Sequence, residues 1–246
     1  MYLRFIFPVF LLVGVVTSDD KKVSVNFYGE AGCPACQQFV IDDLPTVLDD
    51  KELEPHVKFN FFPWGNSYFG TKKCGTGPYD PEQRECWVRL CHDTPDSCFQ
   101  GIPVNQHGAF EGELNVYEGC AKHQEQTKAV HFLRCVEKRL QDVMKSHYDH
   151  VSVHKIMTLC GKENDLDIKK LKQCSKQNKK DRNIEIENAR ATPPHPGVPW
   201  IVVDGTPMDN LNLKQMVCQN LSKEGIKLPT CLSVSVKEDP QEVMVS

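Results

Sequence analysis

The 246-residue sequence has few long apolar segments and no excess of positively charged residues. Lysine and arginine total 29 against 33 aspartate and glutamate residues, so no strong basic field exists to attract nucleic acid. With 15 glycines and 16 prolines, collagen-like and low-complexity architectures are excluded. An aromatic content of 9% predicts a packed core. What the chain has in excess is cysteine, with 12 residues, and this number needs an explanation in compartment or chemistry.

The N-terminus indicates the compartment. Arg4 precedes a short apolar run at residues 5–16, and small residues follow up to Ser18. We interpret residues 1–18 as a secretory signal peptide. The alternative is a membrane anchor, but a spanning helix needs about 20 apolar residues, and this run is shorter and contains Pro8. The mature chain is expected to carry no membrane anchor and to enter an oxidising compartment, where disulfides are the default state of cysteines.

The first third of the mature chain has the pattern of a βαβ unit. Residues 22–28 alternate apolar and polar side chains as a strand does, and residues 57–62 form a second apolar run. Between them, residues 37–52 have helical spacing, with Pro45 expected to kink or break the helix. The two strands should therefore be parallel.

The middle of the chain is less regular. Residues 63–120 read as a loop-rich stretch that needs disulfide staples, and helices are predicted over 124–145, 152–160 and 165–189. The last of these is very polar, and we interpret it as a solvated helix or a mobile insertion.

Regular structure returns near the end. A buried strand is predicted at 200–203, a hairpin turn at Asp204-Gly205 and an amphipathic helix at 211–222. These elements predict an α/β domain over residues 19–233, with a helical, disulfide-stapled insertion at about 63–190 between βαβ and ββα halves. Residues 234–246 are expected to be a flexible tail.

Cys33-Pro34-Ala35-Cys36 is the C-x-x-C pair of this chain, and it lies between a predicted strand and a predicted helix. The partial positive charge and free N–H groups of a helix N-terminus favour a thiolate over a thiol. Cys33 is thus the expected nucleophile and Cys36 the resolving thiol: Cys33 forms a mixed disulfide with a substrate, and Cys36 then displaces the reduced product.

Two other readings of the pair were weighed. A zinc half-site would need a second ligand pair, and no other cysteines have this spacing, although a distant histidine or cysteine could complete such a site. A purely structural disulfide would close a very small loop and gain little chain entropy. We therefore predict a redox pair, with no metal and no bound cofactor.

A second signal is Val198-Pro199-Trp200, directly before the last predicted strand. Thioredoxin-like folds place a cis-proline there, facing the C-x-x-C motif, and the backbone beside it pairs with the substrate. Val198 and Pro199 are the expected substrate-positioning residues, although X-Pro bonds taken alone are cis in only about 5–6% of cases.

Together these motifs resemble the gamma-interferon-inducible lysosomal thiol reductase family, over Val23 to about Cys231. The residues that carry the resemblance are Cys33-Pro34-Ala35-Cys36, Pro63-Trp64-Gly65-Asn66, Gln106-His107-Gly108, Glu111, Asn115, Cys120 and Pro193-Pro194-His195 with Val198-Pro199-Trp200. The family signature C-Q-H-G-x-x-E-C-x-x-N-x-x-x-x-C is met except that Asn105 and Gly112 replace its first two cysteines.

The resemblance implies a thioredoxin-like fold and reduction of protein disulfides in acidic endosomes and lysosomes. Its partners would be disulfide-containing proteins, with an external thiol reductant as the source of electrons. A reductase working in acid needs a strongly depressed Cys33 pKa, which the helix terminus favours and the negative charge of Glu30 opposes.

The expected activity is protein-disulfide reduction, in the lysosome or endosome or after secretion. An oxidase or isomerase, and a secreted binding protein with little catalysis, remain alternatives at this stage.

Several other residues have predicted roles. His107 is a possible acid–base or pH-sensing modulator, whereas His195 is expected to be structural. Asn220 begins an N-glycosylation triplet. The other ten of the 12 cysteines allow up to five bridges, and we expect Cys218–Cys231 and Cys160–Cys174 among them.

Overall fold

A computed structural model describes residues 22–91, 96–146, 152–208 and 212–232, so the predicted signal peptide and C-terminal tail lie outside the described residues. At its centre is a four-stranded sheet in the order β2-β1-β5-β6. Its strands are β1 (Val23–Gly29), β2 (Val57–Pro63), β5 (Trp200–Val203) and β6 (Thr206–Pro207). β1 runs parallel to β2, as the sequence predicted, and antiparallel to β5.

The helix after β1 is continuous but irregular. It consists of α1 (Pro34–Gln38), a π-helical turn (Phe39–Asp43) and α2 (Pro45–Leu48). Pro45 has no N–H to donate, and in the turn before it the N–H of Leu44 bonds to the carbonyl of Phe39, five residues back. The irregularity predicted at Pro45 is found as this π-helical turn, not as an end of the helix, and the helix begins earlier than predicted, at Pro34, where a proline suits the first helical position.

The C-terminal half follows the prediction closely. Asp204 and Gly205 both have positive φ, 45° and 81°, and join β5 to β6 in a tight hairpin. α9 (Leu213–Lys223) begins with a capping box between Asn212 and Gln215. α10 (Pro229–Leu232) follows, and the predicted bridge Cys218–Cys231 joins it to α9.

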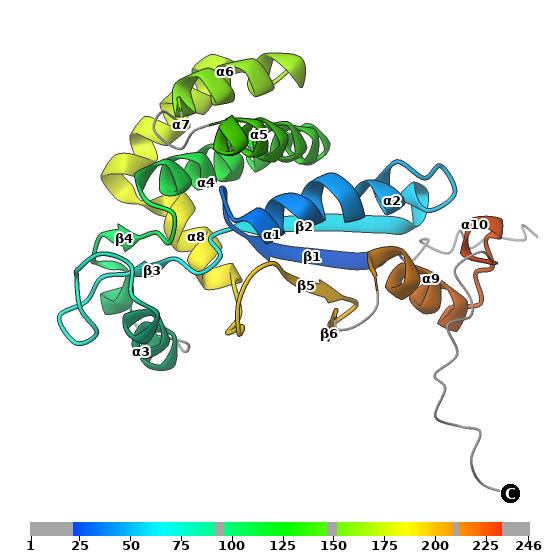
Figure 1. Cartoon of the computed structure of the whole chain (residues 1–246), viewed down its shortest axis with the longest axis horizontal. Coiled ribbons are helices and arrows are strands. Elements are labelled where there is room, and N and C mark those ends of the chain that lie inside the picture. Colours follow the sequence, from blue (N-terminus) through cyan, green and yellow to red (C-terminus); the bar gives the residue numbers. More distant parts are fainter. Residues whose placement is uncertain (1–21, 92–95, 147–151, 209–211, 233–246) are drawn as a thin grey trace, which may run out of the picture.

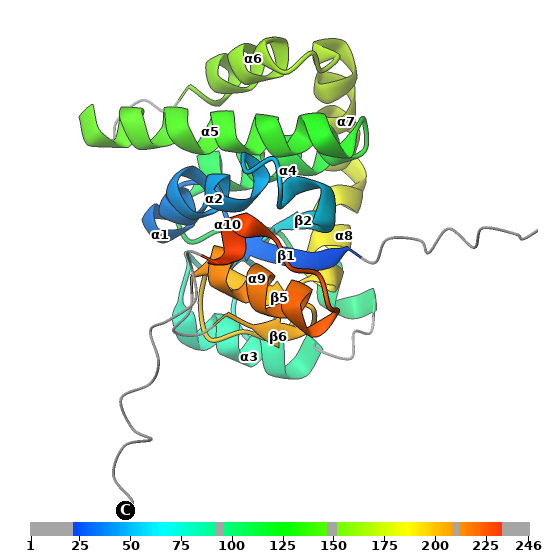
Figure 2. The same ribbon diagram turned by 90° about the vertical axis from the view of Figure 1, so that its right-hand side faces the viewer.

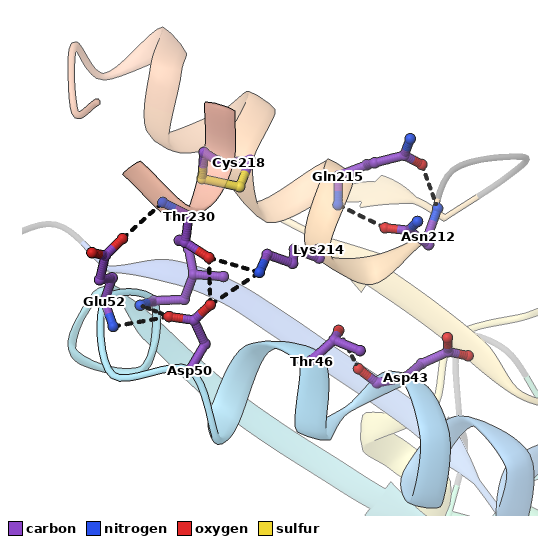
Figure 3. A network of polar contacts seen from close by, with 11 residues as sticks. Asp43, Thr46, Asp50, Glu52, Asn212, Lys214, Gln215, Cys218 and Thr230 are labelled. Carbon is purple, nitrogen blue, oxygen red and sulfur yellow. Dashed lines mark hydrogen bonds and ion pairs between the residues drawn. A yellow bond between two sulfur atoms is a disulfide. The ribbon is translucent and has the colours of Figure 1, made fainter. Parts of the chain in front are cut away.

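A polar network fixes this C-terminal unit to the turn after α2 (Figure 3). The Asp50 carboxylate accepts hydrogen bonds from Lys214 Nζ at 3.0 Å and from the Thr230 hydroxyl at 2.5 Å. The Glu52 carboxylate accepts a bond from the Thr230 N–H at 2.8 Å. The Thr230 and Lys214 contacts lower the pKa of Asp50 to about 2, so this carboxylate stays ionised in acid.

The stretch at 63–120 is more ordered than predicted. It contains β3 (Tyr68–Phe69), α3 (Pro81–Cys91), β4 (Pro103–Val104) and the start of α4 (Ala109–Lys122). One short 3₁₀ helix, Glu54–His56, precedes β2, and another, Asp96–Phe99, lies between α3 and β4. The aromatic rings of Trp64, Phe69, Trp87 and Phe99 pack into a second, smaller core, in stacked, tilted and edge-to-face pairs. The prediction of loop was wrong here because α3 is mostly polar and buries only a few large side chains.

Further helices lie on the side of the sheet that carries α1 and α2, away from α3 (Figures 1 and 2). They are α4, α5 (Gln126–Ser146), α6 (Val153–Glu163) and α7 (Ile168–Asp181). The next helix, α8 (Asn183–Ala191), packs against α4 and β2 beside the sheet, and its Ala189 joins the smaller core that contains Trp87. The helix predicted at 165–189 is in fact two helices, broken at Arg182, which has the left-handed φ of 54°. Asn178 stabilises the break, since its Oδ1 accepts the Ile184 N–H at 2.6 Å.

Five disulfides join these elements, which is the number that the cysteine count allowed. They are Cys74–Cys86, Cys91–Cys98, Cys120–Cys174, Cys135–Cys160 and Cys218–Cys231. The predicted bridge Cys160–Cys174 is wrong, because α6 and α7 each bond to an inner helix, α5 and α4, rather than to each other. α7 is thereby held to α4, while most of its other side chains are exposed, which fits the interpretation as a solvated helix.

Among the described helices, none combines the length and the apolar character needed to cross a membrane.

Candidate active site

Three segments that are distant in sequence meet at the C-terminal end of β1. The parallel register places Gly29 beside Pro63, and the antiparallel register places Tyr28 opposite Trp200. The loop that carries Cys33, the segment after β2 and the segment before β5 therefore share this edge of the sheet. Loops at the carboxyl ends of strands in α/β folds are common places for catalytic groups.

Cys33 caps the N-terminus of α1 and is 7% exposed. Hydrogen bonding from the Cys36 thiol, then from His107 and from the N–H groups of Cys36 and Ala35, lowers the pKa of Cys33 to about 4, although burial opposes this. At neutral pH this residue is therefore a thiolate.

Cys36 lies one turn into α1 and is 0% exposed. Burial, and then its bond to the Cys33 sulfur and the charge there, raise the pKa of Cys36 well above the usual value. The two sulfurs are not bonded to each other, so the structure is that of the reduced pair. Their environments drive the two pKa values apart, as the predicted division into attacking and resolving thiols requires.

His107 comes from the far end of the loop before α4 and lies beside both Cys33 and Glu30. Its Nε2 is 3.3 Å from Glu30 Oε1. Contact with the Cys33 sulfur, and then with Glu30, raises the pKa of His107 to about 10. The ring is consequently an imidazolium beside a thiolate, and this is a stronger involvement than sequence reasoning gave it.

Glu30 is 2% exposed and stabilises the pair of the Cys33 thiolate and the His107 imidazolium. Burial raises the pKa of Glu30, while His107 and the Asn66 N–H, which donates to Oε2 at 2.6 Å, lower it. A Cβ at Gly65 would collide with the Glu30 carboxyl, and Gly65 has a φ of +59°. Glycine at this place in the Pro63-Trp64-Gly65-Asn66 segment therefore makes room for the acid. The expected opposition of Glu30 to the Cys33 thiolate is outweighed, since the pKa of Cys33 is lowered all the same.

Other signature residues hold the His107 loop in place. Glu111 is 0% exposed, and its carboxyl accepts the His107 N–H at 2.5 Å and the Ser67 hydroxyl at 2.9 Å. The Asn66 amide donates to Gln106 Oε1 at 2.7 Å. The sequence identified Glu111 and Gln106 as part of a motif, but it gave no sign that their partners follow β2.

Asn115 makes the corresponding link to the Cys33 loop, because its Oδ1 accepts the Ala31 N–H at 2.9 Å in a buried position.

The two departures from the family signature lie side by side. A Cβ at Gly112 would collide with the Asn105 side-chain amide, so the two positions face each other across the first turn of α4. The Asn105 Oδ1 instead accepts the Ser67 hydroxyl at 2.9 Å. Both replacements therefore belong to one contact, and Cys33 and Cys36 are not part of it.

The peptide bond between Val198 and Pro199 is cis, as expected from the sequence. Val198 packs against the main core, which includes Cys33. Val198 and Pro199 are both partly exposed. The assignment of Val198 and Pro199 to substrate positioning stays a prediction.

His195, a few residues before them, has the structural contacts that were expected. Its Nε2 accepts a bond from Arg84 at 2.8 Å, and its Nδ1 donates to the Pro193 carbonyl at 2.7 Å.

Asn220 lies apart from this site, in α9. It is half-buried, and its side-chain amide donates to the Met216 carbonyl at 2.9 Å. Its glycosylation stays a prediction.

Comparison with known proteins agrees with this geometry. Residues 24–102 match the sequence profile of the family described as Gamma interferon inducible lysosomal thiol reductase (GILT). The Gamma-interferon-inducible lysosomal thiol reductase of Mus musculus is 28% identical over 238 residues, which is 91% of this chain and 77% of that protein. The Gamma-interferon-responsive lysosomal thiol protein of Arabidopsis thaliana is 27% identical over 198 residues, 80% of this chain and 67% of that protein.

Over residues 24–102 the chain is thus similar to the gamma-interferon-inducible lysosomal thiol reductase family. This similarity and the C-x-x-C site described above support a thiol–disulfide oxidoreductase.

Solved structures confirm the predicted fold. The reduced DsbA of Mycobacterium tuberculosis superposes with a TM-score of 0.55 at 14% identity, over 89% of this chain and 90% of that one. The reduced DsbG of the same organism gives 0.55 at 13% identity, over 91% and 93%. The protein thus has a thioredoxin-like fold with a helical insertion.

Proposed function

We propose that this protein reduces disulfide bonds in other proteins through Cys33 and Cys36 and that it works in acid. The observation that carries the proposal is the Cys33 thiolate held beside the His107 imidazolium. An ordinary thiol with a pKa of about 8.5 is a thiolate in roughly one molecule in ten thousand at a pH of about 4.5. With a pKa of about 4, Cys33 is mostly thiolate at that pH.

The reaction balances with the groups at the site. The Cys33 thiolate attacks one sulfur of the substrate disulfide, and the leaving thiolate takes the proton of the His107 imidazolium. Cys36 then attacks the Cys33 sulfur, and its own proton passes by way of the now neutral His107 to the second leaving thiolate. Two electrons and two protons have then moved to the substrate, and the enzyme carries a Cys33–Cys36 disulfide that an external thiol reductant must reopen.

A surface groove next to the site suits a protein substrate. Its volume is ≈ 830 Å³, and it is lined by Gln106 and Gly108 beside His107 and by the apolar residues Tyr79, Ile102 and Val104. Ile102 is 72% exposed, which is unusual for a large apolar side chain. An unfolded segment with apolar side chains could bind there while its disulfide lies at Cys33, and the backbone of Val198 offers a second, strand-like contact.

A second function, disulfide formation at neutral pH, is favoured by the same thiolate. A thiolate stabilises the reduced enzyme, and each pKa unit corresponds to about 30 mV in a two-electron couple. Since the pKa of Cys33 is about 4, this stabilisation is large at neutral pH and nearly disappears in acid. The pair should therefore be a better oxidant at neutral pH and a better reductant, relative to an ordinary dithiol, in acid.

The test is reduction of a denatured disulfide-containing protein at pH of about 4.5 and about 7, with potentials measured at both. We expect Cys33→Ser to abolish reduction and Cys36→Ser to accumulate mixed disulfides with substrate. Equal activity of Cys33→Ser and the wild type would contradict the assignment. An absence of turnover at either pH would favour a binding protein that has kept the fold.

On this reading the protein acts after entry into the secretory pathway, in lysosomes or endosomes or outside the cell. The signal peptide predicted at 1–18, the five disulfides and the lysosomal relatives support that localisation.

A further inference from the structure

Exposed apolar side chains gather at two neighbouring grooves. Among the described residues, the large apolar side chains that are exposed are Leu90, Ile102 and Leu232, at 45%, 72% and 72%. Two of these three, Leu90 and Ile102, line the grooves. Ile102 is held in place there, since its carbonyl accepts the Gly70 N–H at 2.9 Å. Single apolar side chains are common on surfaces, but a groove that collects them indicates a binding surface.

The two grooves join into one. The groove of ≈ 830 Å³ beside His107 and a second groove of ≈ 590 Å³ share Gly70, Thr76 and Gly101. A Cβ at Gly101 would collide with the Gly70 carbonyl, so at this junction backbone packs directly on backbone. None of the three shared residues has a large side chain, and a bound chain can therefore pass from one groove into the other.

The charge of the lining changes along this joined groove. Of the described residues that line it, those in the part beside His107 carry no charge. The second part, which contains Leu90, is lined by the exposed Lys72 and Lys73 and by no described carboxylate. Its far end therefore attracts negative charge, whereas the end beside the active site selects for apolar side chains alone.

We propose that the joined groove recognises unfolded segments in which the disulfide-bonded cysteine is flanked by apolar side chains and, farther along, by acidic ones. With the substrate disulfide at Cys33, the apolar side chains contact Ile102, and the carboxylates reach Lys72 and Lys73. Extended segments suit this groove better than folded ones, because they present successive side chains along its length. The inference rests on the proposed reduction of protein disulfides, and it adds the class of segment that is preferred.

The first test measures binding without turnover. The probe is a fluorescent peptide with a central serine in place of cysteine, flanked on both sides by valine and then by aspartate, and a second peptide has lysine in place of aspartate. At a pH of about 5 the aspartates, with a pKa of about 3.9, are ionised. Fluorescence anisotropy should show that the reduced wild type binds the acidic peptide about three- to tenfold more tightly than the basic one. This difference should shrink as salt is added, because salt screens exposed charges.

A pair of variants tests the apolar part of the groove. Ile102→Ser should weaken binding of the acidic peptide by about tenfold, because the apolar surface that the peptide covers is lost. Leu232→Ser is the matched control, since Leu232 is exposed to the same extent but lies in α10. It should bind the peptide like the wild type.

A second pair tests the charged part. The double variant Lys72→Glu with Lys73→Glu should prefer the basic peptide. Lys169→Glu with Lys170→Glu, at two neighbouring exposed lysines of α7, makes the same change in net charge elsewhere on the surface. It should keep the preference for the acidic peptide.

Kinetics separates this inference from the proposed function. The substrate is two copies of the acidic peptide joined by a disulfide between central cysteines, and Ile102→Ser should raise KM for it by about tenfold, whereas Leu232→Ser should not. A wild type that reduces neither this peptide nor a small soluble disulfide would contradict the proposed reduction, and the anisotropy measurements would still decide on the groove. Equal affinity of the wild type for the two peptides, or wild-type affinity in Ile102→Ser, would overturn the inference even with normal turnover.

Discussion

At the scale of single residues, His107 adds to the effect of Cys36 in stabilising the thiolate of Cys33. The side chain reaches the sulfur only because Glu111 and Gln106 fix the loop that carries it. A positive ring beside the sulfur lowers the energy of the thiolate, and the buried Glu30 keeps the ring protonated. The two residues act together on the nucleophile, although they are 77 positions apart in the chain.

Replacement of His107 by asparagine should therefore raise the pKa of Cys33. Loss of an adjacent opposite charge typically moves a pKa by about 1–3 units. We expect a parallel loss of disulfide reduction that is largest in acid, where a thiol with a higher pKa is protonated. The measurement is thiolate absorbance in the ultraviolet as a function of pH, on the reduced protein.

His123→Asn is the control for this experiment, since its ring pairs with the exposed Glu187 carboxylate on the surface. An unchanged thiolate titration in His107→Asn would show that the helix terminus and Cys36 suffice.

At the scale of elements, a carboxylate after α2 helps to attach the C-terminal helices to the thioredoxin-like core. Asp50, after α2, bonds to Lys214 of α9 and to Thr230 of α10. These contacts join a segment of the first βαβ unit to the last two helices, as Figure 3 shows.

Asp50→Asn should destabilise the protein by about 1–2 kcal/mol, because hydrogen bonds to a charged group are lost. The folded pKa of Asp50, about 2, lies below the unfolded value. Its contribution is therefore complete above about pH 4 and is lost only as the pH falls toward about 2. Urea unfolding near neutral pH and near pH 5 should show the same loss of stability at both.

Asp43→Asn is the matched control for this measurement. Asp43 accepts the Thr46 hydroxyl with its backbone carbonyl, not with its carboxylate, and burial and the neighbouring Asp42 raise its pKa. Removing that charge should leave stability the same or slightly higher. A similar loss in both variants would mean that the Asp50 network contributes nothing specific.

The sequence predicted elements well where local signals are strong. The alternation at 22–28, Pro45, the Asp204-Gly205 turn and the last amphipathic helix all recur in the structure within a few residues. The sequence-based prediction failed where an element's position or a disulfide pairing depends on contacts with residues distant in the chain. Arg182 has no glycine or proline beside it, and the break there depends on Asn178 and on the packing of α8. The pairing of Cys160 and Cys174 depends on which inner helix each outer helix covers.

The candidate site divides in the same way. Cys33, Cys36 and Pro199 were found because their spacing and neighbours carry the signal, and Glu111 was found through the motif. The contact between Glu30 and His107 could not be predicted. It depends on the loop after β2, in which Gly65 leaves room for the Glu30 carboxyl and the Asn66 N–H donates to it.

At the scale of the whole molecule, several acids are buried around the interface of α4 and α5. Glu118 and Glu137 are 1% and 2% exposed. Burial raises the pKa of Glu111 and of Glu118 to about 8 and raises that of Glu137 well above its usual range. Because the folded state binds protons on these carboxyl groups more tightly than the unfolded state does, low pH stabilises the folded state.

Stability should accordingly fall as the pH rises. The folded pKa values of Glu111 and Glu118 lie above the unfolded value of about 4.3, so their stabilising effect is complete below that pH and is lost as the pH rises toward about 8. Each such proton corresponds to about 1.4 kcal/mol per pH unit. The thiolate of Cys33 acts in the opposite direction, and oxidation to the disulfide removes its effect.

Thermal unfolding of the oxidised protein from pH of about 5 to about 8 measures this directly. The unfolding temperature should decrease over that range, and Glu118→Gln should make the decrease shallower, because glutamine stays neutral. A profile that is flat in the wild type, or unchanged in Glu118→Gln, would mean that the buried acids are ionised in the folded state.

The burial of the structural bridges bears on a hazard that any thiol–disulfide oxidoreductase meets: its thiolate can exchange with the bridges of neighbouring molecules. Cys120 and Cys160 are 1% and 0% exposed, so each shields one end of its bridge in the helical layer. Cys74 and Cys86 are both partly exposed, and Thr76, two residues after Cys74, lines the groove beside the site. In a concentrated solution, exchange between molecules should therefore begin at Cys74–Cys86 rather than in the helical layer.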